Sequence, residues 1–238
     1  MKMKSKLGDM FQNHPQITLK LFESLIKPIL LYASDFWGIL RLPKNNPLET
    51  LHHSFCKQLL GVQKQTTNIG VLLELGQVPL KYYAKRNAIK NWKRISTHNS
   101  TNDILIKSFK FALSQELTWP IEIRTNLSEI GMMEYFLNNE QYNMIHDKAF
   151  QRMCDIFHQN AFAEIKKETS KLRTYSYLKT TIGLENYLCT QKNTHDRIHF
   201  SKLRLSNHQL MIEKGRHLLI ENHLRFCPFC THKVEESW

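Results

Sequence analysis

The chain has 238 residues, of which 42 % are hydrophobic and 23 % charged, a balance that excludes a disordered protein. Thirty-three Lys and Arg against 21 Asp and Glu give a formal net charge of +12. Such an excess favours polyanionic partners, with nucleic acid ahead of an anionic membrane. A basic but unspecialised surface would give the same count, so charge alone does not decide between the two.

Cysteine usage and the first residues bear on the compartment. The five cysteines are an odd number, and residues 1–16 are basic and polar without the apolar core of a secretory signal. We therefore expect an intracellular protein, nuclear or cytoplasmic and not secreted, whose cysteines are core residues or metal ligands. The longest apolar run, residues 28–33, is far shorter than the roughly 20 residues that a membrane span needs.

The residue patterns in the first half of the chain predict helices. Eight Gly and seven Pro are few for this length, which favours long helices over many short strands. Apolar residues at helical spacing predict a buried helix over 19–33, kinked by Pro28 and ended at Trp37-Gly38. Asn46 and Pro47 suit the cap and first position of a helix over 47–60, with Glu49 reaching back to the cap and Gly61 as the stop.

Further helices are predicted at 67–75, closed by Gly76, and at 79–96. In the latter an apolar face is opposed by cations, which we interpret as a solvated face in preference to a phosphate track. A polar break at 99–102 is the best linker candidate. Helices are also predicted at 103–117, 120–131, 139–158 and 160–170, and no useful alternating strand pattern or repeat occurs. The expected fold is all-α, an irregular multi-helix array.

Residues 166–225 are markedly basic, with twelve Lys or Arg against five Asp or Glu. Tyr175, Tyr177, Tyr187 and Phe200 are interleaved with these cations, a pattern that fits phosphate contact combined with base stacking. The alternative is that the tyrosines are core residues and the cations are merely solvated. The candidate nucleic-acid contacts are Arg173, Arg197, Lys202, Arg204, His208, Arg216 and Arg225.

Catalytic motifs are missing from the sequence. All six aspartates are isolated, whereas two-metal phosphoryl transfer needs clustered carboxylates. Asp35 is better explained as a cap or turn residue, and Cys154 as a core residue. The chain also lacks a Gly-rich phosphate loop and the common hydrolase motifs. We expect no catalytic residues.

The C-terminal Cys227-x-x-Cys230 is half of a zinc knuckle, with Pro228-Phe229 able to form the turn between two thiolates. Structural zinc takes four Cys or His donors, and His232 is the nearest further candidate. With these donors alone we expect weak zinc binding at most, and two free thiols in the isolated chain. The second pair of ligands does not appear, so we expect the chain to be a piece of a longer protein.

Several blocks of sequence follow one another along the chain in the order of a known family. The most specific is Leu21-Phe22-x-x-Leu25-Ile26-x-Pro28-Ile29-Leu30-Leu31-Tyr32-x-Ser34-x-x-Trp37-Gly38. Next come Glu49-x-Leu51-x-x-x-Phe55-Cys56-Lys57-x-Leu59-Leu60-Gly61-Val62 and Glu74-Leu75-Gly76-x-x-Pro79-Leu80. The series resumes at Arg173-Thr174-Tyr175, Glu185-x-Tyr187-Leu188, Lys202-x-Arg204-x-Ser206-x-His208-x-Leu210-x-Ile212-Glu213-x-Gly215-Arg216 and Arg225-x-Cys227-x-x-Cys230. Together these blocks resemble reverse transcriptases from LINE-type (non-LTR) retrotransposons, in the thumb-side end and the region downstream of it.

The resemblance implies a helical region downstream of the polymerase palm, ending in a zinc-knuckle-like segment that helps to bind template RNA or target DNA. The palm with its Tyr-x-Asp-Asp site would lie upstream of Met1, so the resemblance does not carry over polymerase activity. It implies four consecutive segments: a thumb-side remnant (1–45), a helical connector (46–165), a basic helical region (166–226) and a truncated knuckle-like tail (227–238).

Sequence alone leaves two rival functions open. The first is a helical interaction or structural module without a nucleic-acid role, in which a face that once packed on the palm now meets another protein or binds nonspecifically; an upstream reverse transcriptase domain is a candidate partner. The second is an enzyme assembled with such a polymerase piece. We expect RNA or DNA binding without a membrane role or catalysis.

Overall fold

The computed structural model describes residues 10–43, 46–96, 104–137, 144–167, 170–172, 175–191 and 193–226. In these ranges the fold is all-α, as predicted, and an isolated antiparallel bridge joins Leu75 to Leu184. No helix among them is long and apolar enough to cross a membrane.

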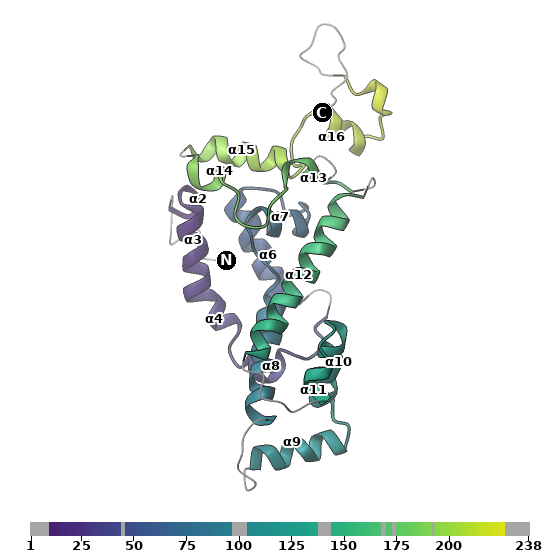
Figure 1. Cartoon of the computed structure of the whole chain (residues 1–238). Coiled ribbons are helices and arrows are strands. Elements are labelled where there is room, and N and C mark those ends of the chain that lie inside the picture. Colours follow the sequence, from purple (N-terminus) through teal and green to yellow (C-terminus); the bar gives the residue numbers. More distant parts are fainter. Residues whose placement is uncertain are drawn as a thin grey trace. The chain divides into compact units, whose positions relative to one another are not determined.

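The helices succeed one another with short connections (Figure 1). Their bounds are α2 (Met10–Asn13), α3 (Pro15–Leu21), the π-helical turn η1 (Phe22–Ile26), α4 (Lys27–Leu30), α5 (Ser34–Trp37), α6 (Pro47–Leu60), α7 (Asn68–Glu74), α8 (Leu80–Ser96), α9 (Ile104–Ser114), α10 (Thr118–Glu129), α11 (Glu134–Leu137), α12 (Ile145–Ile165), α13 (Tyr175–Leu178), α14 (Tyr187–Thr190), α15 (Thr194–Arg204), α16 (Met211–His217) and the 3-10 turn η2 (Asn222–Leu224).

The chain divides into two compact units, each built from separated stretches of sequence. Unit 1 comprises Met1–Lys20, His53–Gln77 and Ala161–Trp238, and unit 2 comprises Leu21–His52 and Val78–Asn160. The four segments expected from the sequence are consecutive, whereas both units are discontinuous. Residues distant in sequence are therefore brought together inside each unit.

The N-terminal helical segment changes its hydrogen-bond pattern just before Pro28, the residue at which a kink was predicted. The turn before it is π-helical, and the Lys27 N–H bonds the carbonyl of Phe22, five residues back. A proline lacks an N–H and crowds the preceding turn, so a widened turn relieves both effects. The predicted burial of the whole 19–33 face is wrong, because Ile29 is 71 % exposed while Phe22 is fully buried.

Two helix starts in unit 2 show how side chains set the boundaries. Asn46 caps α6 as predicted, its Oδ1 accepting from the Leu48 N–H at 3.1 Å. Glu49 was expected to return to this cap, but its Oε1 accepts from the Lys81 N–H at 2.7 Å. The Glu49 carboxylate therefore caps the first turn of α8. Packing brings it close to one of the backbone N–H groups that have no acceptor within that helix.

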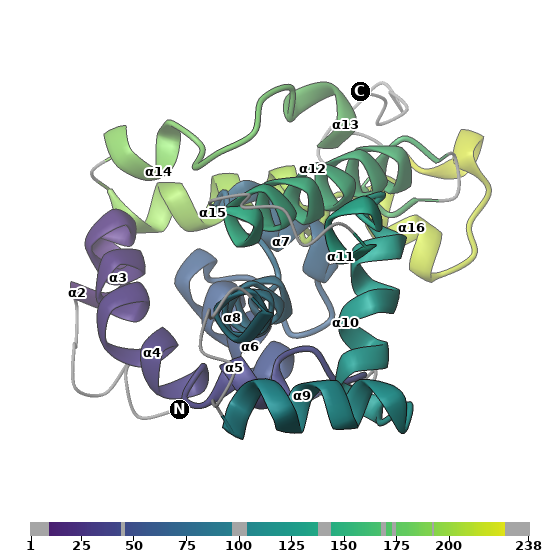
Figure 2. The ribbon, with the colours of Figure 1, turned by 60° about the horizontal axis from the view of Figure 1, so that its bottom comes forward.

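The core of unit 2 forms around α8, whose predicted apolar face is buried at Leu80, Ala84, Ala88 and Trp92. Residues of α10 and α12 pack in the same cluster. Gly38 follows α5 where this segment meets α8, and a Cβ at Gly38 would lie 2.2 Å from the carbonyl oxygen of Ala84. Only glycine permits this approach. Figures 1 and 2 show α9 running across α10 at the edge of this unit.

Two sequence predictions fail around α12. The residues after 144 form one helix through Asn160, not separate helices over 139–158 and 160–170. Asn160 is a weak helix former, yet the helix continues because apolar residues on both sides, Met153 and Ile165, are buried. The predicted linker at 99–102 and residues 139–143 lie outside the described ranges.

In unit 1 the core joins α6 and α7 to the C-terminal part of the chain. Gly61 ends α6 with a φ of +68° as predicted, and a Cβ there would meet the side chain of Ile198 at 2.9 Å. A Cβ at Gly70 in α7 would meet Leu172 at 2.8 Å. Through these contacts α7 packs against the end of α15 and the segment before α13. Glu74, at the C-terminal end of α7, therefore lies among residues from the C-terminal part of the chain.

Candidate nucleic-acid interface

Glu74 is the last residue of α7 and is fully buried. The chain turns sharply beyond it at Gly76, where φ is +61° and a Cβ would lie 2.5 Å from the carbonyl carbon of Gly183. This close approach forms the Leu75–Leu184 bridge and lets the Glu185 N–H bond the Glu74 carbonyl at 3.2 Å. The backbone therefore brings two carboxylates, those of Glu74 and Glu185, to the same place.

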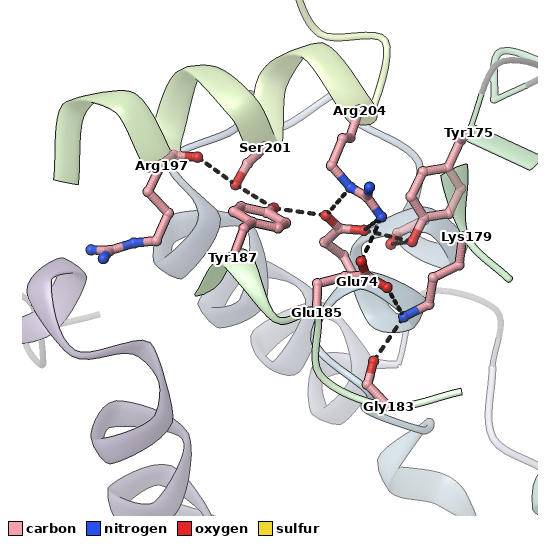
Figure 3. A network of polar contacts seen from close by, with 10 residues as sticks. Glu74, Tyr175, Lys179, Gly183, Glu185, Tyr187, Arg197, Ser201 and Arg204 are labelled. Atoms are coloured by element: carbon pink, nitrogen blue, oxygen red, sulfur yellow. Dashed lines mark hydrogen bonds and ion pairs between the residues drawn. The ribbon is translucent and has the colours of Figure 1, made fainter. Parts of the chain in front are cut away.

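Four hydrogen bonds converge on the Glu74 carboxylate (Figure 3). Its Oε1 accepts from Tyr187 Oη at 2.7 Å and from Arg204 Nε at 2.6 Å. Its Oε2 accepts from Tyr175 Oη at 2.7 Å and from Arg204 Nη2 at 3.3 Å. Because a carboxylate offers about four lone-pair positions, this set leaves none for a metal ion or a substrate proton.

Glu185 and Lys179 complete this buried network. Glu185 Oε2 pairs with Arg204 Nη2 at 2.8 Å, and its Oε1 pairs with Lys179 Nζ at 2.6 Å. Lys179 also donates to the Gly183 carbonyl at 2.8 Å, and its side chain is completely enclosed. Two carboxylates thus face two cations. We call the cluster of Glu74, Tyr175, Lys179, Glu185, Tyr187 and Arg204 the Glu74 network.

The surroundings of this network shift the pKa of its members. Burial and the Glu74 carboxylate raise the pKa of both tyrosine hydroxyls, Tyr175 and Tyr187, well above the ordinary value. Burial acts to lower the pKa of Arg204, but its bonds to Glu74 and Glu185 outweigh burial and raise it. Folded, the tyrosines stay neutral donors and the arginine stays charged, which is the state that these hydrogen bonds require.

Two other arginines that were predicted to contact phosphate are buried and donate hydrogen bonds to backbone carbonyls. Arg197 is 4 % exposed; it donates to the backbone carbonyls of Gln12 and Gln191, the latter at 2.7 Å. Arg225 is 9 % exposed, and its Nε donates to the Ile220 carbonyl at 2.9 Å while its stem lies against Gly215. With Arg204, three predicted cations are therefore buried donors to protein oxygens.

Lys202 and His208 are the two predicted residues that the structure brings together at the surface. Both line an open pocket of about 700 Å³ at the end of α15, together with Gln63, His199, Phe200 and Asn207 among others. The side chains of Arg173 and Arg216 lie outside what the structure describes. The predicted set is thus split between interior and surface.

Burial separates the cations of the basic segment whose side chains the structure describes, a distinction that the sequence does not show. Lys179, Arg197, Arg204 and Arg225 are buried. Among the described residues, four cations reach the surface and have no acidic partner: Lys166, Lys171, Lys202 and Lys214. Lys167 is exposed but paired with Glu164.

The aromatic residues divide in the same way. Tyr175 is fully buried in the Glu74 network, and Tyr187 is a partly buried member of it, whereas Tyr177 is 84 % exposed and Phe200 45 % exposed. For Tyr175 the alternative that sequence left open, a core residue, is correct. Sequence analysis identified Glu74 and Glu185 only as parts of matching blocks, and it interpreted Tyr175 and Tyr187 as possible stacking residues. No local pattern in the sequence signals that the four residues meet.

The remaining candidates from the sequence are the C-terminal zinc ligands and Cys154. Cys227, Cys230 and His232 lie outside the described ranges. Within those ranges, no three His, Cys, Asp or Glu side chains are placed to share a metal ion. Cys154 is buried, as expected for a core residue, and burial raises the pKa of its thiol to about 11. Comparison with family models, with curated proteins and with solved structures gives no match.

The raised tyrosine pKa values predict how stability depends on alkaline pH. The folded state keeps the Tyr175 and Tyr187 protons where the unfolded state loses them, so the free energy of unfolding is retained below the unfolded pKa and falls above about pH 10. Each tyrosine contributes a slope of up to about 1.4 kcal/mol per pH unit. Tyr187→Phe should flatten the fall measured by urea unfolding, whereas Tyr177→Phe should not. An equally steep fall in both variants would contradict the network.

Proposed function

We propose that the chain is a non-catalytic helical module that binds RNA or DNA electrostatically, of the kind found downstream of the polymerase palm in the LINE-type reverse transcriptases that it resembles. The ordered sequence blocks support the family, and the net charge of +12 supports a polyanionic partner. The matching Glu74, Tyr175, Glu185, Tyr187 and Arg204 support a structural role for several blocks, since they form one network.

The observation that carries the proposal is the division of α15 into two faces. Its inner face places Ser201 and Arg204 against the Glu74 network, where they are buried. Its outer face presents His199, Phe200 and Lys202 to a surface pocket. A rigid scaffold behind an exposed aromatic and an unpaired lysine is the arrangement that single-stranded nucleic-acid binding uses.

Salt-titrated binding tests this proposal. Wild-type affinity for a fluorescent single-stranded RNA should fall steeply between about 50 and 200 mM salt, because phosphate contacts release counterions. Replacing Lys166, Lys171, Lys202 and Lys214 together by Gln should weaken binding and reduce the salt slope by about 2–3. The loss should be similar for different sequences, since phosphates carry no sequence code.

The matched control removes the same charge elsewhere. Lys90, Lys107, Lys110 and Arg124 are exposed residues of unit 2, and replacing them together by Gln should leave the slope near that of the wild type. An equal loss in both variants would indicate a diffuse basic surface and not an interface in unit 1. Absence of wild-type binding to RNA, duplex DNA and a polyanion would contradict the proposal.

A second candidate function rests on an apolar surface in unit 2. Leu25, Ile29, Tyr32 and Phe36 are each 59–82 % exposed although they lie in the block that resembles the thumb-side end. Exposed apolar residues grouped in one segment are typical of an interaction surface. The corresponding function is a protein-interaction module that docks on an upstream reverse transcriptase domain. Wild-type chain that binds no nucleic acid but associates with such a domain would favour it.

Our proposals on catalysis and metal binding rest on the sequence alone. We propose that the chain has no polymerase activity of its own, because no two of its aspartates are adjacent. For zinc we propose weak binding by Cys227 and Cys230, which supply half of the usual four donors.

A further inference from the structure

We infer that the pocket at the end of α15 holds one unpaired base of a single-stranded nucleic acid, stacked on Phe200. This inference rests on the proposed function and names its recognition site. The pocket has a volume of about 700 Å³ and is open to solvent at its mouth. A second recess of about 370 Å³ is lined by Phe200, Asp196 and Tyr187. Phe200 therefore borders two recesses.

The Phe200 ring is both accessible and held in place. It is 45 % exposed, and it meets the Tyr187 ring at a centroid distance of 4.8 Å in an edge-on arrangement. Tyr187 is fixed in turn by its hydrogen bond to Glu74, and the Arg204 guanidinium lies 5.9 Å from the Phe200 ring. The Glu74 network thus orients a stacking platform at its edge. Stacking on such a ring tolerates any base, because every base has a π-face.

Polar groups around the ring suit a nucleotide. Lys202 has no acidic partner among the described residues and can contact a phosphate. Asn207 Oδ1 accepts from the Gln63 N–H at 3.1 Å, which directs the Asn207 amide group beside the pocket. His208 Nδ1 accepts from the Leu210 N–H at 3.3 Å, and Leu203 and Leu210 add apolar surface to the lining. Apolar surface combined with placed polar groups is typical of ligand pockets.

Asp196 adds a preference among bases. It lines both recesses, and its carboxylate accepts hydrogen bonds but cannot donate them when ionised. Adenine and cytosine present an exocyclic amino group, whereas uracil flanks its single N–H with two carbonyl oxygens that a carboxylate repels. We therefore expect oligo(A) and oligo(C) to bind more tightly than oligo(U).

The test compares the affinity of two variants for a single-stranded nucleic acid, Phe200→Leu and Tyr177→Leu. Tyr177→Leu is the matched control, because it also removes an exposed aromatic side chain from unit 1. Phe200→Leu keeps apolar bulk but removes the π-face, so affinity for a single strand should fall about 5- to 100-fold. Affinity for blunt duplex DNA, whose bases are already stacked, should not change. Phe200→Trp should restore single-strand binding, and Tyr177→Leu should bind like the wild type.

Ultraviolet cross-linking of the wild-type chain to the same strand gives a readout that does not depend on variant folding. Cross-links should map to Phe200 or its neighbours on α15. Equal affinity of Phe200→Leu and Tyr177→Leu, with cross-links elsewhere, would overturn the pocket while leaving salt-dependent binding intact. Competition by free AMP as strong as that by an oligonucleotide would also overturn it, because the site would then recognise a mononucleotide. Wild-type chain that binds no nucleic acid would overturn both proposals.

Discussion

Replacing Glu74 by Ala should destabilise unit 1 by about 3–5 kcal/mol, the cost of removing one partner from a buried ion pair. The substitution removes the carboxylate that accepts from the Tyr175 and Tyr187 hydroxyls and leaves Arg204 with only Glu185 as an acidic partner. A buried donor without an acceptor retains its full desolvation penalty, and here three donor groups lose one at once. Urea unfolding followed by circular dichroism would measure the change.

Glu164 provides the matched control, because it is a glutamate of unit 1 whose ion pair with Lys167 lies at the surface, with its side chain 50 % exposed. Exposed pairs of this kind contribute about 1 kcal/mol or less, so Glu164→Ala should change the free energy of unfolding by no more than that. Similar effects of Glu74→Ala and Glu164→Ala would show that the buried network contributes little to stability.

Replacing Arg204 by Met should have a comparable effect on stability and little on nucleic-acid affinity. Arg204 is 6 % exposed and bonds both carboxylates of the network, so its removal leaves the buried Glu74 carboxylate without its cation and Glu185 with Lys179 alone. We expect a loss of about 3–5 kcal/mol. Under conditions where the variant stays folded, its affinity for RNA should match the wild type, because Arg204 cannot reach a phosphate.

Lys202→Gln should behave in the opposite way. Lys202 lies two residues earlier on α15, on the outer face, and has no acidic partner among the described residues. Its substitution should change stability by about 0.5 kcal/mol or less and weaken RNA binding with a smaller salt slope. Reduced RNA affinity in folded Arg204→Met, together with wild-type stability, would restore the phosphate-contact interpretation that the sequence suggested.

Local signals predicted the helices well. Asn46 and Pro47 start α6, Gly61 and Gly76 end helices with positive φ, and the periodic face of α8 is buried. Each of these features depends on neighbours within a few residues, which sequence displays directly. The predicted break between residues 158 and 160 is wrong, because α12 continues through it with buried residues on both sides.

The Glu74 network could not be predicted in the same way. Tyr175, Tyr187 and Arg204 lie 101, 113 and 130 residues from Glu74 in the sequence. A count of charges over residues 166–225 treats Arg204 and Lys202 alike, although one neutralises buried carboxylates and the other faces solvent. Only the fold distinguishes a cation used for structure from one available to a ligand.

A double-mutant cycle between Glu74→Gln and Arg204→Met tests most directly whether the network holds unit 1 together. The free energy of unfolding is measured for the wild type, both single variants and the double variant. If the two side chains stabilise one another, the effects should be non-additive, with a coupling of about 1.5–3 kcal/mol. If the two effects add to within about 0.5 kcal/mol, the idea of a shared network is contradicted, and Arg204 would be interpreted as a surface cation like its neighbours.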